Sequence, residues 1–146
     1  MLSHSRKTGC IARHINHIAL VVSDLEETIM FYMETFGVTN PEVVELQDHG
    51  VKAALVRVGG SQLEFIQPLE NTGGIAKFIE KHGTGIHHIC FEMDDLNQSL
   101  EKLEAAGIKL IDKTSRSGLS GDIAFIHPKS TGGVLIELVD SESARR

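Results

Sequence analysis

The stretch NHIALVVSDLEETIMFYMETFGV, residues 16–38, occurs a second time in the chain as HHICFEMDDLNQSLEKLEAAGI, residues 87–108. His17 matches His88 at a constant offset, and the same offset aligns the following isoleucines and, further on, an Asp-Leu pair in each copy. Self-similarity at one spacing is the signature of a duplicated structural unit. The fold of this chain is therefore expected to contain one unit twice.

A second pair of segments keeps almost the same spacing. GGSQLEFI, residues 59–66, corresponds to GGVLIELV, residues 132–139. Two matches at nearly one spacing are difficult to explain by chance. We predict a tandem duplication with its copies at residues 14–70 and 85–140.

Each copy contains the same order of predicted elements. It begins with an apolar run rich in β-branched and aromatic residues, which is typical of a strand. Asp24 and Asp95 then stand at the N-cap of a helix with one apolar stripe, and Gly37 and Gly107 end these helices. Three further strands are predicted in each copy: residues 42–47, 51–58 and 62–67 in the first, and 108–113, 122–127 and 134–139 in the second. The predicted fold class is α+β, built from tandem βαβββ modules.

The two modules are predicted to form a single domain over residues 14–140. A short helix at residues 75–83, IAKFIEKHG, joins them. Its apolar residues are expected to face inward: Ile75, Phe78 and Ile79. Residues 1–13 and 141–146 are predicted to be terminal tails.

Composition narrows the class of protein. The 146 residues are 41% hydrophobic and 23% charged, which is the balance of a soluble globular domain. With 20 acidic and 14 basic residues the net charge is −6, and no basic cluster marks a nucleic-acid surface. No apolar run approaches the roughly 20 residues that a membrane helix needs.

The cysteines and the N-terminal sequence bear on location. The chain has two cysteines, Cys10 in a predicted tail and Cys90 in a predicted buried strand, so we do not expect a disulfide framework. The opening MLSHSRKTGCIARH is polar and lacks the apolar centre of a signal peptide. We expect a cytoplasmic protein.

Four polar residues stand at matching places in the two copies. Because side chains alternate faces along a strand, Glu64 within LEFI and Glu137 within LIEL are expected to be buried between apolar neighbours. An unpaired buried carboxylate costs several kcal/mol, so each needs a partner or a proton. A duplicated unit tends to pack about a pseudo-two-fold axis, which would bring both glutamates together with His17 and His88.

Two imidazoles and two carboxylates suit one divalent cation such as Co, Zn, Ni, Mn or Fe(II). A lone histidine in a strand is more often structural, and a lone strand glutamate usually faces solvent. The metal prediction therefore depends on all four residues occurring together at repeat-related positions.

The quoted motifs resemble the vicinal-oxygen-chelate superfamily over nearly all of residues 14–140. This resemblance implies an open, eight-stranded half-barrel of paired βαβββ modules around a metal. Within that superfamily the chain is most similar to the methylmalonyl-CoA epimerases. Three stretches carry the similarity: DHGVKAALV (residues 48–56), GTGIHHICFEMDD (residues 83–95) and FIHPKSTGGVLIELV (residues 125–139).

The resemblance implies an isomerase that interconverts (2R)- and (2S)-methylmalonyl-CoA by abstracting the α-proton through a metal-stabilised enolate. It makes His17, His88 and Glu137 metal ligands, and it places Glu64 as the fourth ligand where some members carry Gln. Glu137 and Asp48 are the predicted acid/base residues on the two faces, Asp48 standing where the family usually has Glu. We further expect Glu92 to orient the site, and Lys129 and Ser130 to bind the acyl-CoA. A homodimer is also implied.

Three alternatives share this fold. Glyoxalase I uses the same kind of metal site on a glutathione hemithioacetal. An extradiol dioxygenase would need two histidines and one glutamate around Fe(II), and the fourth ligand argues against it. A metal-free binding module usually lacks the ligand set, whereas all four positions are filled here.

Overall fold

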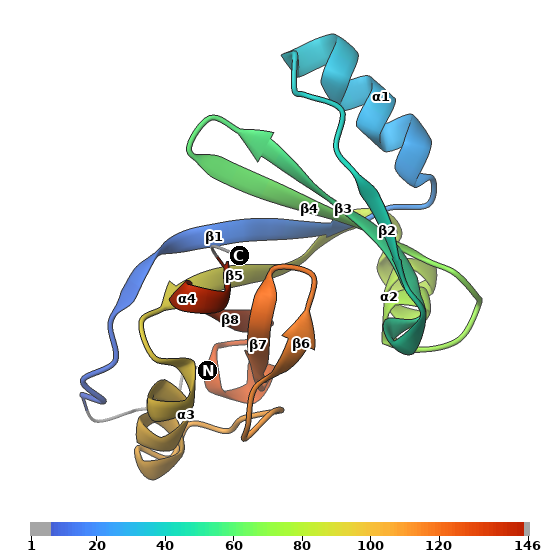
Figure 1. The fold of residues 1–146 in the computed structure, drawn as a ribbon. Helices are drawn as coiled ribbons and strands as arrows, with labels where there is room; N and C mark the ends of the chain where they lie inside the picture. The colour runs from blue at the N-terminus through green and yellow to red at the C-terminus, as the bar shows by residue number, and fades with distance from the viewer. Residues whose placement is uncertain (1–6, 145–146) are drawn as a thin grey trace. The chain divides into compact units, whose positions relative to one another are not determined.

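The computed structural model describes residues 7–144. They form two compact units, and each carries one βαβββ module. The first-repeat unit is His17–His87, and the second-repeat unit joins the residues up to Asn16 with those from His88 onward. Strand β1 (Ala12–Val21) begins in the second-repeat unit and ends in the first-repeat unit. Figure 1 labels the elements along the chain.

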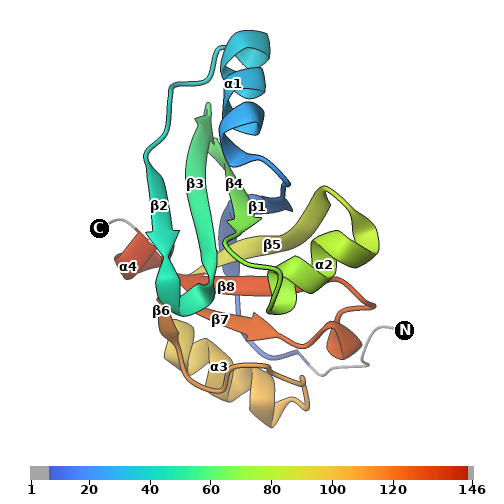
Figure 2. The ribbon, with the colours of Figure 1, turned by 90° about the vertical axis from the view of Figure 1, so that its right-hand side faces the viewer.

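In the first-repeat unit the strand order is β2-β3-β4-β1, and β1 contributes its last part. Strand β1 runs parallel to β4, whereas β2, β3 and β4 are antiparallel neighbours that lie side by side in Figure 2. Its other elements are α1 (Leu25–Phe36), β2 (Val43–Leu46), the 3₁₀ turn η1 (Gln47–His49), β3 (Val51–Val58), β4 (Ser61–Pro68) and α2 (Gly74–His82). The predicted elements of this half are confirmed.

Helix α1 begins and ends at the predicted residues. The Asp24 carboxylate accepts the N–H of Glu27 at 2.9 Å, which satisfies one of the donors exposed in the first turn. Gly37 takes a left-handed conformation with φ 66° and donates to the carbonyl of Met33. The helix packs its apolar stripe on the sheet, where the Phe65 side chain is fully buried.

The second-repeat unit contains the sheet β5-β8-β7-β6 with α3 packed against it. Strands β5 and β8 are parallel, while β8, β7 and β6 are antiparallel neighbours. The elements are β5 (Gly85–Met93), α3 (Leu96–Ala105), β6 (Arg116–Gly118), β7 (Gly121–Ile126), the 3₁₀ turn η2 (Pro128–Ser130), β8 (Ile136–Asp140) and α4 (Ser141–Ala144). The predicted α+β class with two βαβββ modules is confirmed.

The predicted strand at residues 108–113 is wrong. Only Leu110 makes a β-bridge there, to Ile126, and the second strand of the module is β6. The Asp112 carboxylate accepts the N–H of Phe125 at 2.9 Å. The Phe125 N–H is therefore not available for a further backbone hydrogen bond to this segment. The segment accordingly makes one bridge and no strand.

Helix α3 repeats the cap of α1, because the Asp95 carboxylate accepts the N–H of Gln98 at 2.9 Å. Gly107, with φ 83°, follows its last turn. Replacing Asp95 with Ala is expected to lower the free energy of unfolding by about 1 kcal/mol, because the first turn loses its side-chain acceptor. Urea unfolding followed by circular dichroism measures the change. Glu101→Ala, an exposed change in the same helix, is the control, and an equal loss there would refute the capping effect.

Helix α2 lies within the first-repeat unit, and the predicted joining helix is confirmed with its bounds shifted by one residue. Ala76 is buried, and the three predicted inward residues are half-buried: Ile75, Phe78 and Ile79. Both cysteines are free thiols, as expected. In the described part of the chain, no helix is long and apolar enough to cross a membrane.

Candidate metal and catalytic site

The first-repeat unit buries His17 on β1 next to Glu64 on β4. The two strands run parallel, with Ala19 directly opposite Glu64, so the side chains of His17 and Glu64 reach each other along one face. Their Nε2 and Oε2 atoms lie 3.5 Å apart. His17 is 0% exposed and Glu64 is 7% exposed. The predicted burial of Glu64 is confirmed.

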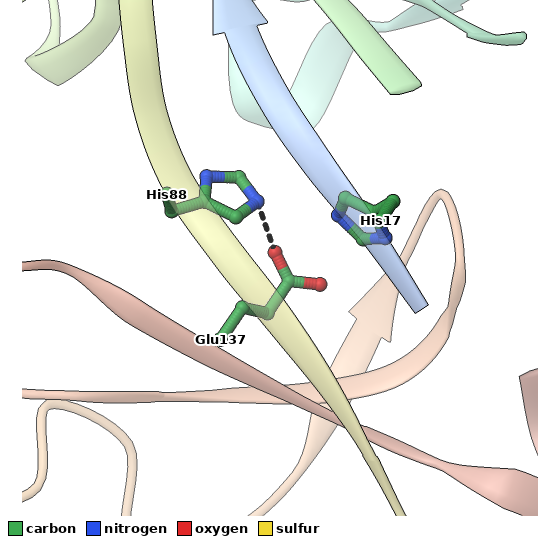
Figure 3. A group of neighbouring side chains, drawn as sticks. All are labelled: His17, His88 and Glu137. Carbon is green, nitrogen blue, oxygen red and sulfur yellow. Dashed lines mark ion pairs between the residues drawn. The ribbon is translucent and has the colours of Figure 1, made fainter. Parts of the chain in front are cut away.

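The second-repeat unit contains the repeat-related pair, His88 on β5 and Glu137 on β8. Cys90 stands opposite Glu137 in the parallel pairing, which repeats the arrangement of the first-repeat unit. The His88 Nε2 and Glu137 Oε2 atoms are 2.7 Å apart, and each residue is 3% exposed. Figure 3 draws this ion pair as a dashed line.

Pairing resolves the cost of burying these carboxylates. A glutamate removed from water needs compensating contacts, and in each unit the imidazole provides one. Among residues 7–144, no buried side-chain nitrogen or oxygen lacks a hydrogen-bond partner. Imidazole nitrogen and carboxylate oxygen are also the ligand atoms that borderline divalent metals favour. The donor chemistry of the two pairs therefore fits such a cation.

Two further residues shape the second pair, and the sequence motifs did not identify them. The Ser120 hydroxyl donates to Glu137 Oε1 at 3.2 Å, so both carboxylate oxygens have a contact. The Phe125 ring meets the His88 ring edge-on, with centroids 5.4 Å apart and an interplanar angle of 90°. Phe125 also stands opposite Glu137 across β7 and β8. Together they restrict the orientation of the His88–Glu137 pair.

Glu92 is buried on β5, on the same face as His88. Its Oε2 atom accepts a hydrogen bond from Asn16 Nδ2 at 3.2 Å and lies 3.0 Å from His14 Nε2. These contacts hold the first part of β1 against β5, immediately before the residue that bears the His17 imidazole. An orienting role for Glu92 stays a prediction, and these contacts are what it would act through.

The remaining predicted residues lie on turns. Asp48 is exposed in η1, and Gly50 closes that turn with φ 65° and an N–H donated to the carbonyl of Gln47. Lys129 is exposed in η2, and the Ser130 hydroxyl accepts the backbone N–H of Lys109 at 2.9 Å. The catalytic role of Asp48 and the substrate-binding role of η2 stay predictions.

Comparison with known proteins gives consistent matches. The profile of the family described as "Glyoxalase/Bleomycin resistance protein/Dioxygenase superfamily" matches residues 16–125. The human mitochondrial methylmalonyl-CoA epimerase is 37% identical over 126 residues, which cover 85% of this chain and 72% of the human protein.

Solved structures of methylmalonyl-CoA epimerases are also similar to this chain. A crystal structure of methylmalonyl-CoA epimerase from Mycobacterium tuberculosis has a TM-score of 0.84 and 34% identity, covering 96% of this chain and 92% of that one. A methylmalonyl-CoA epimerase in complex with methylmalonyl-CoA and ammonium has a TM-score of 0.85 and 29% identity, covering 92% of this chain and 98% of that one. The similarity thus extends over nearly the whole chain.

Proposed function

Because the chain belongs to the glyoxalase/bleomycin resistance protein/dioxygenase superfamily, we propose that it is an isomerase that interconverts (2R)- and (2S)-methylmalonyl-CoA. The similarity to named epimerases over most of the chain supports this substrate. The observation that carries the chemistry is the buried His88–Glu137 pair, with its repeat-related counterpart in the first-repeat unit.

We propose that one divalent cation per subunit is held by His17, Glu64, His88 and Glu137. The support is that each repeat supplies one buried imidazole and one buried carboxylate at equivalent positions of its sheet. Such a cation, when bound, supplies Lewis-acid stabilisation of the negative charge that develops on the thioester oxygen, an effect of several kcal/mol. Co, Zn, Ni and Mn all suit this donor set.

Glu137 is the proposed base on one face of the substrate. The contacts of Oε1 with Ser120 and of Oε2 with His88 hold its carboxylate in one orientation before substrate arrives. The C–H bond at the α-carbon breaks, the proton passes to the carboxylate, and the electron pair delocalises into the thioester as an enolate. The enolate is then reprotonated on the opposite face by Asp48, which must be in its acid form at that step. Exchange with solvent returns both carboxyl groups to their starting states.

The test of this function is proton exchange at the α-carbon. Incubating (2S)-methylmalonyl-CoA with the protein in heavy water should introduce deuterium at that carbon and produce the (2R) epimer, both detectable by NMR. A parallel incubation with the glutathione hemithioacetal of methylglyoxal distinguishes the glyoxalase I reaction. Turnover of the hemithioacetal with no exchange in the acyl-CoA would overturn the proposal.

Replacing Asp48 with Asn is expected to separate exchange from epimerisation. One epimer presents its α-proton to Glu137 and should still exchange it, whereas formation of the opposite epimer should fall about 10²-fold for want of the second acid/base. Separate NMR measurements of deuterium uptake and of epimer ratio check this. Glu42→Gln, an exposed carboxylate change in the same unit, is the matched control. Normal epimerisation by the Asp48 variant would remove that residue from the mechanism.

The proposed assembly is a homodimer, as the family resemblance implies. The proposed location is the cytoplasm. Light scattering coupled to size-exclusion chromatography measures the mass of the particle in solution. A mass near the 16.0 kDa of one chain at micromolar concentration would contradict the dimer.

A further inference from the structure

Residues 111–116 contact one aromatic residue of β7 at three points. The Asp112 carboxylate accepts the Phe125 N–H at 2.9 Å, and the Phe125 carbonyl accepts the Ile111 N–H at 2.9 Å. The guanidinium carbon of Arg116 lies 5.5 Å from the centre of the Phe125 ring, which is the geometry of a cation–π contact. This segment therefore fixes both the backbone and the ring of Phe125.

Asp112 links these contacts through its two carboxylate oxygens. Oδ2 accepts the Phe125 N–H, and Oδ1 accepts a hydrogen bond from Arg116 Nε at 3.2 Å. Arg116 stands opposite Ile123 across β6 and β7, two residues from Phe125, so the Arg116 and Phe125 side chains share one face of the sheet. A single carboxylate thus holds the strand and, through Arg116, the cation over the ring of the same residue.

The Phe125 ring stands beside both members of the His88–Glu137 pair. Phe125 and Glu137 face each other across β7 and β8, and both backbone groups of Phe125 are used on the other side, toward residues 111 and 112. Phe125 and Glu137 therefore form a non-hydrogen-bonded antiparallel pair, the kind in which side chains approach most closely. The same ring meets the His88 ring edge-on.

We propose that Asp112 and Arg116 are positioning residues for the metal ligand His88, and that they act through the Phe125 ring. This inference rests on the proposed function, because that function makes His88 a ligand of the cation. An imidazole that is already oriented when the cation arrives loses less side-chain freedom on binding, so the affinity for metal is higher. Groups that orient a metal-binding histidine commonly change metal affinity by about 10- to 100-fold.

The first test is the affinity of the full chain for cobalt(II), measured by titrating the chelated protein. In Asp112→Asn only one oxygen remains, which can accept the hydrogen bond of either the Phe125 N–H or Arg116 Nε but not both. The dissociation constant should rise about tenfold. Glu104→Gln is the matched control, because it breaks an ion pair with Lys113 in the same unit, and both of these side chains are exposed. Circular dichroism verifies that each variant is folded.

A double-mutant cycle shows whether Asp112 acts through the ring. Phe125→Leu removes the ring and should weaken cobalt binding at least as much as Asp112→Asn. If the effect passes through Phe125, the double variant binds cobalt no more weakly than Phe125→Leu alone. A general loss of stability gives effects that multiply, and that result would overturn the proposal. Arg116→Lys, which keeps a cation at this position, should retain more affinity than Arg116→Gln.

The orientation of the His88 ring is also measurable without metal. An aromatic ring shifts the resonances of protons held near it, so Asp112→Asn should move the His88 ring-proton signals in the NMR spectrum of the metal-free protein. The signals of the exposed His82 should stay unchanged. This readout depends neither on turnover nor on a bound cation.

The outcomes separate this inference from the proposed function. Wild-type affinity for cobalt and unmoved His88 signals in Asp112→Asn would overturn the positioning role, whether or not the protein is an epimerase. If Arg116→Gln binds cobalt normally but has a raised KM for methylmalonyl-CoA, Arg116 contacts the substrate and the inference falls. If the wild-type protein binds no divalent cation and the His88 signals still move, the positioning of the imidazole stands and the proposed cation site falls.

Discussion

Removing divalent cations with a chelator is expected to abolish α-proton exchange, with a rate loss of about 10³-fold or more. The reason is that the proposed cation stabilises the enolate charge by several kcal/mol, and each 1.36 kcal/mol of barrier is a factor of ten. Adding back Co, Zn, Ni or Mn should restore exchange to different extents. The measurement is deuterium uptake in heavy water before and after chelation, with metal content determined on the same samples.

A stability measurement adds a readout that does not depend on turnover. A cation that binds the folded chain and not the unfolded one raises the melting temperature, so chelated protein should unfold at a lower temperature than metal-loaded protein. His17→Ala and His88→Ala should both lose this difference, because each removes one proposed ligand. His82→Ala, on the surface of α2, should keep it.

The histidine variants also test whether one cation uses both repeats. If His88→Ala loses the metal while His17→Ala keeps the full stoichiometry and affinity, the site belongs to the second-repeat unit alone. Full exchange activity in protein shown to be free of metal would contradict the cation altogether. Loss of metal in both variants, with normal folding by circular dichroism, is the expected result.

The duplicated sequence predicted most of this architecture because a repeat gives two independent indications of each element. Asp24 and Asp95 each precede an apolar stripe, and both prove to be helix caps. The burial of Glu64 and Glu137 followed from the bulky apolar residues that flank them in short strands. Alternation along a strand is a strong local signal, and here tertiary packing did not override it.

What the sequence missed depends on contacts between distant segments. Residues 108–113 have a strand-like composition, yet the Asp112 side chain takes the Phe125 N–H and the segment makes a single bridge. Ser120 lies in the turn between β6 and β7, where a serine is common for local reasons. Only the folded chain shows that its hydroxyl reaches Glu137. Side-chain hydrogen bonds of this kind leave no periodic trace in a sequence.

Replacing Glu137 with Gln is expected to cause the largest loss of any single substitution, about 10⁴-fold in kcat/KM for methylmalonyl-CoA. The amide keeps the size of the side chain and can still accept the Ser120 hydroxyl, but it carries no charge and cannot take a proton. The variant therefore replaces a charged proposed metal ligand with a weaker neutral one and removes the proposed base at once. A 10⁴-fold loss is a barrier increase of about 5 kcal/mol.

Separate measurements are needed because these two losses have different signatures. Metal titration measures the first, and deuterium uptake at saturating metal measures the second. With the site saturated, the Glu137 variant should no longer exchange the α-proton of the epimer that presents it to that carboxylate, while the epimer that faces Asp48 can still exchange. Asp48→Asn should show the opposite selectivity, which distinguishes the two variants. Glu101→Gln, an exposed glutamate on α3, should behave as wild type. For the epimer that faces Glu137, exchange within tenfold of wild type by the metal-saturated variant would require another base on that face.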